Sequence, residues 1–153
     1  MSSLLHSEEN FGIVVHGGAG VMSGLSEERQ QQIHKKIQET VSEAYEILEN
    51  GGSSFDAVEL AVSMLEDSPL FNAGRGSVYN SDEVQEMDAS IMDGKNRLSG
   101  AVASVSTVKN PIKLARKVAE ETKHVLLVGE GAERFARDIG CLLYTSDAAD
   151  DTC

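Results

Sequence analysis

Hydrophobic residues recur at helical spacing in two segments of the first half of the chain. The first predicted helix begins after Ser26, a suitable N-cap, and ends at Gly51. The second begins at Ser53, which forms a capping-box pattern with Asp56, and ends near Pro69. The apolar faces consist of Ile33, Ile37, Val41, Ala44 and Leu48 in the first helix and Ala57, Val58, Ala61, Met64 and Leu65 in the second. Both helices are therefore expected to pack one face against a core.

Strand-like patterns occupy four other segments. Residues 11–20 (FGIVVHGGAG) predict a short β-branched strand that ends in a glycine turn. Residues 87–92 and 100–108 alternate between apolar and polar positions, and the sequence DGKNRLSG between them predicts an antiparallel pair joined by a turn. Residues 124–129 (HVLLVG) are apolar throughout, which predicts a buried strand.

Two more helices complete the predicted order of elements. Asn110 is placed to cap a third helix with Pro111 at its first position, and this helix should run to about Thr122. Residues 130–140 (EGAERFARDIG) predict a last short helix. The order β-α-α-β-β-α-β-α, without internal repeats or Pro-rich linkers, is an α/β or α+β pattern.

These patterns divide the chain into three parts. Residues 11–140 carry every predicted element, and residues 1–10 precede them as an N-terminal extension. Residues 141–153 (CLLYTSDAADDTC) show no continuing periodicity and end in small and acidic residues, so we interpret them as an unrelated tail. A truncated or chimeric reading frame is our hypothesis for its origin.

The charge balance narrows the range of partners. A chain of 153 residues is long enough for one domain with a sizeable core. Its formal net charge is -12 and its 13 Lys and Arg are scattered, which argues against binding to nucleic acid or to an acidic membrane surface. The first ten residues lack the features of a secretory signal, and no run of about 18 apolar residues occurs. We therefore predict a cytoplasmic protein.

Two local features suggest chemistry, each with a structural alternative. Residues 16–20 (HGGAG) could cradle a phosphate, but the lysine and hydroxyl of a P-loop are missing and Ser23 replaces the third glycine of GxGxxG. Local features favour a tight turn with His16 hydrogen-bonded inside. An acidic group could ligate a metal or form a carboxylate pair, but it has no companion histidine, which favours solvated or capping carboxylates. Its members are Glu83, Glu86, Asp88 and Asp93.

Five motifs in order resemble the N-terminal half of the plant-type asparaginase/isoaspartyl peptidase family. They are VVHGGAG, LEDSPLFNAGRGSV, EMDASIMDG, GAVASVSTVKNPIKLARKV and HVLLVGEGAERFA, within about residues 11–140. The pair FNAGRGSV and EMDASIMDG is the most specific part, whereas HGGAG alone would be weak. The resemblance implies an N-terminal-nucleophile hydrolase with a four-layer αββα sandwich, of which only the first half is present. Family members are made as one precursor that cuts itself into an α and a β subunit.

The resemblance also implies a mechanism for hydrolysing L-asparagine and β-aspartyl (isoaspartyl) dipeptides. Self-cleavage frees a threonine whose own α-amine then serves as the base for its hydroxyl, as in threonine proteases. In the family this threonine follows glycine or aspartate and precedes Val-Gly. That context occurs at none of Thr40, Thr107, Thr122, Thr145 and Thr152. No catalytic residue is assigned, and we expect the chain alone to be inactive.

Supporting residues can be matched to the family one by one. The resemblance implies that His16, Gly17 and Gly18 orient the scissile bond for self-cleavage and that Asn72 lies near it. It implies no cofactor other than a structural sodium ion, bound by main-chain carbonyls that brace the catalytic threonine. The matching carbonyls belong to Leu65, Glu66, Ser68, Phe71, Ala73 and Arg75. The implied assembly is an (αβ)₂ homodimer with the β subunit of the same precursor.

Two other functions remain open from the sequence. The chain could be a non-catalytic α/β module that binds a partner polypeptide, or a nucleotide-binding α/β domain. Half of a two-sheet sandwich would leave an apolar sheet face and unpaired strand edges in water, and both features favour association. We therefore expect poor solubility for the chain alone and rescue by a matching β subunit.

Overall fold

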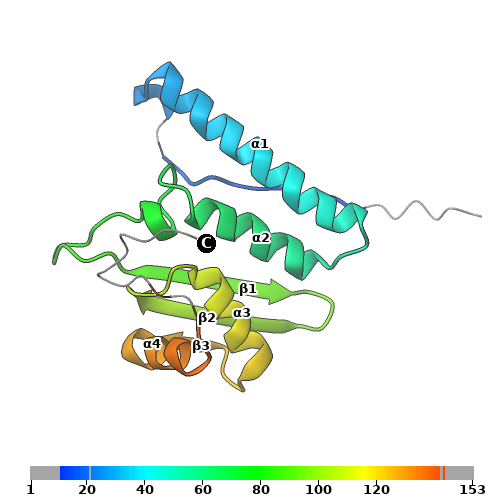
Figure 1. The fold of residues 1–153 in the computed structure, drawn as a ribbon, viewed down its shortest axis with the longest axis vertical. Helices are drawn as coiled ribbons and strands as arrows, with labels where there is room; N and C mark the ends of the chain where they lie inside the picture. Colours follow the sequence, from blue (N-terminus) through cyan, green and yellow to red (C-terminus); the bar gives the residue numbers. More distant parts are fainter. Residues whose placement is uncertain (1–10, 21, 142, 144–153) are drawn as a thin grey trace, which may run out of the picture.

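The computed structural model describes residues 11–20, 22–141 and 143 (Figure 1). The predicted extension at 1–10 and nearly all of the predicted tail at 141–153 lie outside the described residues. The fold is mixed α/β, as predicted, and none of the described helices is long and apolar enough to cross a membrane. In chain order its elements are η1 (Met22–Gly24), α1 (Glu27–Glu49), α2 (Ser54–Glu66), η2 (Gly74–Gly76), β1 (Met87–Asp93), β2 (Leu98–Val105), α3 (Pro111–Glu121), β3 (Leu126–Val128) and α4 (Gly129–Asp138).

The first two helices begin and end where their caps predict. Ser26 Oγ accepts a hydrogen bond from the backbone N–H of Arg29 at 3.2 Å and so caps α1. Gly51, with a φ of 77°, follows the end of this helix in the left-handed region that glycine favours. Ser53 Oγ accepts from the N–H of Asp56 at 3.1 Å and donates to its carboxylate at 2.6 Å, which confirms the local pairing at the start of α2.

The sheet has the order β1-β2-β3. β1 and β2 pair antiparallel, which confirms the predicted hairpin, and β3 pairs parallel to β2. The register shifts between Met87 and Ala89, where Ser104 of the opposite strand adopts a φ of 51°. Asp88 stabilises this irregularity, because its Oδ1 accepts a hydrogen bond from the N–H of Ser104 at 2.8 Å.

The predicted strand at residues 11–20 is wrong, because this segment has no strand partner among the described residues. It is extended and runs between α1 and α2 (Figure 1). Ile13 and Val15 pack against the helices, whereas Val14 between them is 95% exposed. The β-type side-chain alternation is therefore present, and what is missing is a neighbouring backbone that could pair with it.

The strand predicted at residues 124–129 is present as the shorter β3, but the prediction that it is buried is wrong. Only Leu126–Val128 forms a strand, and Val125, Leu126 and Val128 are 65%, 49% and 53% exposed. An apolar run of this kind predicts cover on both faces. β3 is instead an edge strand of the sheet, with cover on one face.

Helices cover one face of the sheet. Side chains of β1 and β2 form a single core with α3, α4 and the start of α2, centred on Val102, Val105, Leu114, Val118 and Ala136. α1 packs on the outside of α2 through a small-residue contact that includes Ala44, Ala57 and Ala61. The shared core therefore places α3, α4 and the start of α2 on one face of the sheet. α1 lies beyond α2, away from the strands (Figure 1).

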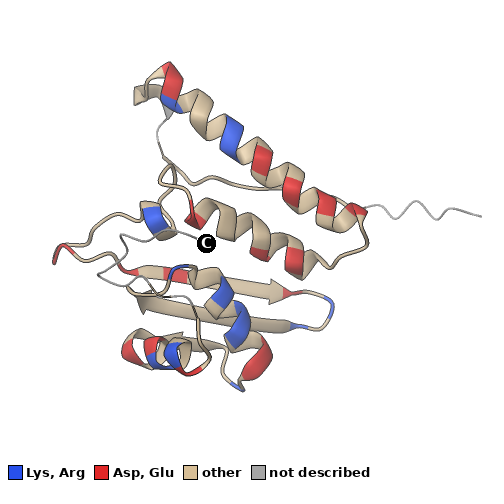
Figure 2. Cartoon of the chain, viewed as in Figure 1, with Lys and Arg blue, Asp and Glu red and all other residues tan. Residues whose placement is uncertain are grey.

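The opposite face of the sheet is open. Strand alternation and register put Ser90, Met92, Ala101, Ala103, Leu126 and Val128 on this side. Met92 is 64% exposed, and Leu126 and Val128 are about half exposed. The strands carry almost no charge between their ends (Figure 2). Small and apolar side chains on an uncharged face are typical of a surface that packs against protein.

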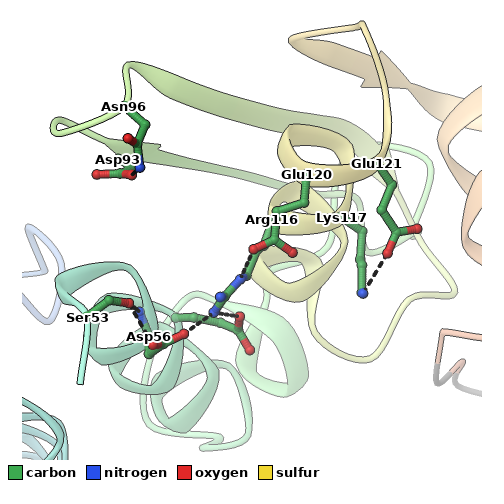
Figure 3. A network of polar contacts seen from close by, with 9 residues as sticks. Ser53, Asp56, Asp93, Asn96, Arg116, Lys117, Glu120 and Glu121 are labelled. Atoms are coloured by element: carbon green, nitrogen blue, oxygen red, sulfur yellow. Dashed lines mark hydrogen bonds and ion pairs between the residues drawn. The ribbon is translucent and has the colours of Figure 1, made fainter. Parts of the chain in front are cut away.

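One arginine joins α2 to α3 (Figure 3). Arg116 Nη1 lies 2.7 Å from Asp56 Oδ1 and 2.8 Å from Glu59 Oε2, and its Nε lies 2.8 Å from Glu120 Oε1. The guanidinium also lies over the ring of Phe55, 4.7 Å from its centroid. These contacts hold the two helices that carry the polar residues of the candidate site.

Candidate functional site

The two glycine-containing loops singled out in the sequence line one cavity of about 790 Å³. The walls come from the HGGAG turn, from α1 and α2, and from the loop after α2, and they include His16, Gly17, Gly18, Leu65, Phe71 and Asn72. The four residues matched to self-cleavage thus share a cavity although they are separated by more than fifty positions in the sequence. Their roles stay predictions, because the cavity shows proximity and not chemistry.

The close packing of the HGGAG turn explains its glycines. A Cβ at Gly17 would lie 2.9 Å from Ile37 Cδ1 and 3.0 Å from Phe71 Cε1, so a side chain there would separate the turn from α1 and from the second loop. Gly18 has a φ of 107°, and its N–H donates to His16 Nδ1 at 3.1 Å. The tight turn is therefore observed, although His16 is exposed and not enclosed as predicted.

Asn72 lies between two cavities and closes its own loop. Its Oδ1 accepts a hydrogen bond from the N–H of Val78 at 3.0 Å. Asn72 also lines a second cavity, of about 200 Å³, together with Glu66, Glu86 and Asp88. The side chain of Asn72 is thus held by a backbone N–H, and the residue lines both cavities.

Three members of the acidic group accept hydrogen bonds from nearby protein groups. Within the described residues, no cluster of three or more His, Cys, Asp and Glu could hold a metal ion. Glu86 accepts from Asn80 Nδ2 at 2.8 Å, and Asp93 accepts from the N–H of Lys95 at 2.9 Å in the β1–β2 turn. Together with Asp88 at the strand irregularity, these bonds match the interpretation of capping carboxylates. Glu83 is exposed and has a φ of 59° in the loop before β1.

The loop from residue 65 to residue 76 folds tightly around its own carbonyls. A Cβ at Gly74 would overlap the carbonyl oxygen of Glu66, and a Cβ at Gly76 would overlap that of Phe71. The loop can therefore close only because both positions are glycine. Leu65 O accepts from the N–H of Ser68 at 3.2 Å, and Ala73 O accepts from that of Gly76 at 3.0 Å.

Other carbonyls of this loop have no hydrogen-bond donor in the described part of the chain. They belong to Glu66, Ser68 and Phe71, all of which are buried. Buried carbonyl oxygens without donors are uncommon, and hard cations bind such neutral oxygens. The loop therefore fits a small hard cation held by main-chain oxygens, which is the kind of site that the resemblance implies.

The carboxylate of Glu66 lies directly behind this loop. It is 3% exposed, and it accepts hydrogen bonds from the N–H of Ile112 at 3.0 Å and from Asn110 Nδ2 at 3.1 Å. Burial raises the pKa of Glu66 to about 7, although both hydrogen bonds act in the opposite direction. Asn110 was predicted to cap α3 with its side chain, but it makes no such cap, and Glu66 occupies the helix N-terminus instead.

A second buried carboxylate, Glu133, fixes the connection between β2 and α3. Its Oε1 accepts from the N–H of Ser106 at 2.7 Å and from that of Thr107 at 3.0 Å, and its Oε2 accepts from the Thr107 hydroxyl. Desolvation raises the pKa of Glu133, but these hydrogen bonds outweigh it, so the pKa lies below its usual value. Glu133 is therefore a charged anchor between this connection and α4.

The threonines within the described residues serve the scaffold. Thr40 donates to the carbonyl of Lys36 at 2.8 Å inside α1, and Thr122 donates to that of Val118 at 2.8 Å at the end of α3. Thr107 is bound to Glu133. Thr145 and Thr152 lie outside the described residues.

A family model described as Asparaginase matches residues 9–151. The chain belongs to the asparaginase family. It is 53% identical over 128 residues to the Isoaspartyl peptidase/L-asparaginase of Rattus norvegicus, covering 84% of this chain and 38% of the rat protein. It is 55% identical over 128 residues to the Plant-type L-asparaginase of Pyrococcus furiosus, covering 84% of this chain and 41% of that protein.

The chain thus spans about two fifths of the length of the curated asparaginase-family relatives that it matches. This agrees with the resemblance to an N-terminal portion. Three side-chain roles near the site were not predicted from the sequence, namely those of Glu66, Asn110 and Glu133. An acidic residue at the buried end of a helix, as in LEDSP, was the only available signal, and its partner lies 46 positions away.

Proposed function

We propose that the chain is the N-terminal portion of an isoaspartyl peptidase/L-asparaginase precursor. The observation that carries this proposal is its identity of about half to relatives with that name, over motifs that surround one cavity. In the whole protein the substrates are L-asparagine and β-aspartyl dipeptides, and the attacking group is a threonine freed by self-cleavage. The 153 residues contain no Gly-Thr-Val-Gly or Asp-Thr-Val-Gly, so the chain alone is inactive.

The reaction follows from the chemistry of an N-terminal threonine. The hydroxyl first attacks the carbonyl carbon of the peptide bond that precedes it, which moves the acyl group from nitrogen to oxygen and frees the α-amine. Water then hydrolyses this ester, so the preceding segment leaves as a carboxylate and the hydroxyl is free again. The amine then takes the proton of the same hydroxyl as it attacks the side-chain amide of the substrate, and ammonia or an amino acid leaves. Water hydrolyses the resulting acyl-enzyme. Residues 16–18 and Asn72 border the cavity of about 790 Å³ and orient the bond to be cut.

The open face of the sheet supports a four-layer αββα sandwich completed by the β subunit. Met92, Leu126 and Val128 would be buried when a second sheet packs there. Separately, residues 11–15 make no backbone hydrogen bond within the described residues, so an added strand could pair with them. The partner polypeptide favoured by this face is therefore the other half of the same precursor. An (αβ)₂ assembly and a cytoplasmic location stay predictions.

The loop after α2 would hold a sodium ion with the carbonyls of Leu65, Glu66, Ser68, Phe71, Ala73 and Arg75. When bound, the ion supplies a fixed positive charge that neutralises converging carbonyl dipoles. The glycine contacts at Gly74 and Gly76, together with the carbonyls that lack donors, support this assignment. The loop borders the cavity through Phe71 and Ala73, so bracing it also braces the wall that Asn72 occupies.

Ammonia release tests the proposal. The 153-residue chain should release no ammonia from L-asparagine, and neither should the C-terminal part of the rat relative when expressed without its first part. Co-expression of the two polypeptides should give a complex with activity toward L-asparagine or a β-aspartyl dipeptide. Activity of the chain alone would refute the missing nucleophile. A failure of the two polypeptides to form a complex would refute the packing role of the open face.

A further inference from the structure

Glu66 contacts the loop after α2 through its carbonyl oxygen and the start of α3 through its carboxylate. Its carbonyl oxygen lies against Gly74, where the loop closes and where a Cβ would also lie 2.7 Å from the Glu66 Cα. Its carboxylate lies at the start of α3, where Ile112 and Asn110 donate to it. The last residue of α2 is thus held from both sides.

Asn110 extends this connection to the next residue of the loop. Its Nδ2 donates to Glu66 Oε2 and to Asp67 Oδ1, each at 3.1 Å. Asn110 is buried, and Lys109 lies 4.0 Å from the same Asp67 oxygen. The end of α2 therefore cannot rotate without breaking hydrogen bonds to a helix more than forty residues away in the sequence.

We propose that Glu66 is a positioning residue for cation binding, because its carboxylate ties the loop to the start of α3 and thereby fixes the direction of the carbonyls. This inference rests on the sodium site of the proposed function. A main-chain site needs several carbonyls to converge, and ordering them during binding would weaken affinity. The bonds to Ile112 and Asn110 supply that order before the ion arrives.

The substitution Glu66→Gln separates this role from general stability. Glutamine keeps an oxygen for the N–H of Ile112 but replaces the oxygen that accepts from Asn110 with an NH₂ group. Groups that orient metal ligands typically change affinity by about 10–100-fold when mutated. We expect Glu66→Gln to raise the sodium concentration for half-maximal stabilisation about tenfold, and Glu66→Ala to raise it further.

Glu59→Gln is the matched control. Glu59 lies on the same helix and also bonds to α3, through Arg116, but it lies about two turns before the end of α2, where the loop begins. The same chemical change there should lower the unfolding temperature without changing the sodium concentration for half-maximal effect. Asn110→Ala is a second way to weaken the link between Glu66 and α3. It removes the side-chain donor to Glu66 and leaves the N–H of Ile112 as the donor to this carboxylate.

The experiment titrates NaCl against N-methylglucamine chloride at constant ionic strength. The unfolding temperature of the 153-residue chain and the hydrogen exchange of amides at 66–76 are measured for each variant. The inference is supported if the sodium concentration for half-maximal stabilisation rises in Glu66→Gln and Asn110→Ala and is unchanged in Glu59→Gln. An equal response in Glu66→Gln and wild type overturns it and leaves the sodium site standing. No sodium response in the wild type refutes the site and the inference together. If Glu66→Ala does not fold, the two milder variants decide.

Discussion

Gly74→Ala should damage the loop that we assign to the cation, by two separate effects. Gly74 has a φ of 51°, and a non-glycine residue in this left-handed region costs about 1–2 kcal/mol. The added Cβ would also lie 2.6 Å from the Glu66 Cβ and would overlap the Glu66 carbonyl, and overpacking of this kind costs about 1–3 kcal/mol. We expect a total loss of roughly 3 kcal/mol in the free energy of unfolding.

Urea unfolding measures this loss, with Gly94→Ala as the control. Gly94 lies in the β1–β2 turn, has no neighbouring atom within 4 Å of an added Cβ, and is not among the glycines with positive φ. Its substitution should change stability by less than about 0.5 kcal/mol. For a domain of this size, 3 kcal/mol corresponds to a fall of about 10 °C in the unfolding temperature.

A third variant separates the two effects. Asn tolerates the left-handed region better than Ala but still carries a Cβ, so Gly74→Asn relieves strain and keeps the overlap. We expect Gly74→Asn to lie between wild type and Gly74→Ala, and both variants to lose sodium-dependent stabilisation. If Gly74→Ala matches Gly94→Ala in stability and in its sodium response, the tight closure of the loop around the Glu66 carbonyl is wrong.

Two further predictions concern the scaffold. Arg116→Ala should lower stability by about 2 kcal/mol in urea unfolding, because it removes bonds to three carboxylates and the contact with the Phe55 ring. Lys117→Ala, which removes one exposed pair on the same helix, should have a much smaller effect, and equal effects would show that the Arg116 contacts contribute nothing. Glu133 has a lowered pKa, so its contribution is present above its ordinary value of 4.5 and is lost as pH falls through the lower folded value. Glu133→Gln should therefore flatten the decline of the urea midpoint between about pH 5 and pH 3, and an unchanged slope would contradict the anchor role.

The elements that could be predicted from sequence are those whose causes are local. Ser26 and Ser53 cap helices within three residues of themselves, and the β1–β2 hairpin is specified by its own alternation and turn. The turn at Gly18 is local as well, because the N–H of Gly18 donates to His16. In each case the residues that specify the element lie within the element itself, so the local sequence contains most of the signal.

The predictions that were wrong concern partners far away in the sequence. Residues 11–15 alternate as a strand should, but a strand also needs a neighbouring backbone, and none of the described residues provides one. The cap of α3 was assigned to Asn110 because of its position, whereas Glu66 fills that place from another helix. A local pattern shows which groups need a partner but cannot show which distant group supplies it.

In the described chain nearly all buried polar side chains have hydrogen-bond partners, whereas several apolar side chains remain uncovered. This contrast indicates the kind of partner that the chain would bind. Of the buried side-chain polar atoms that are described, only Ser63 Oγ lacks a hydrogen bond, and the buried carboxylates of Glu66 and Glu133 each have several donors. In contrast, the side chains of Met92 and Leu126 are exposed, and residues 11–15 make no backbone hydrogen bond within the described part of the chain. A module that bound a charged ligand would instead leave polar groups without partners and keep its apolar side chains covered. We therefore expect the partner in the proposed assembly to supply a packed apolar face and a strand backbone, which is what the second half of an αββα sandwich would contribute.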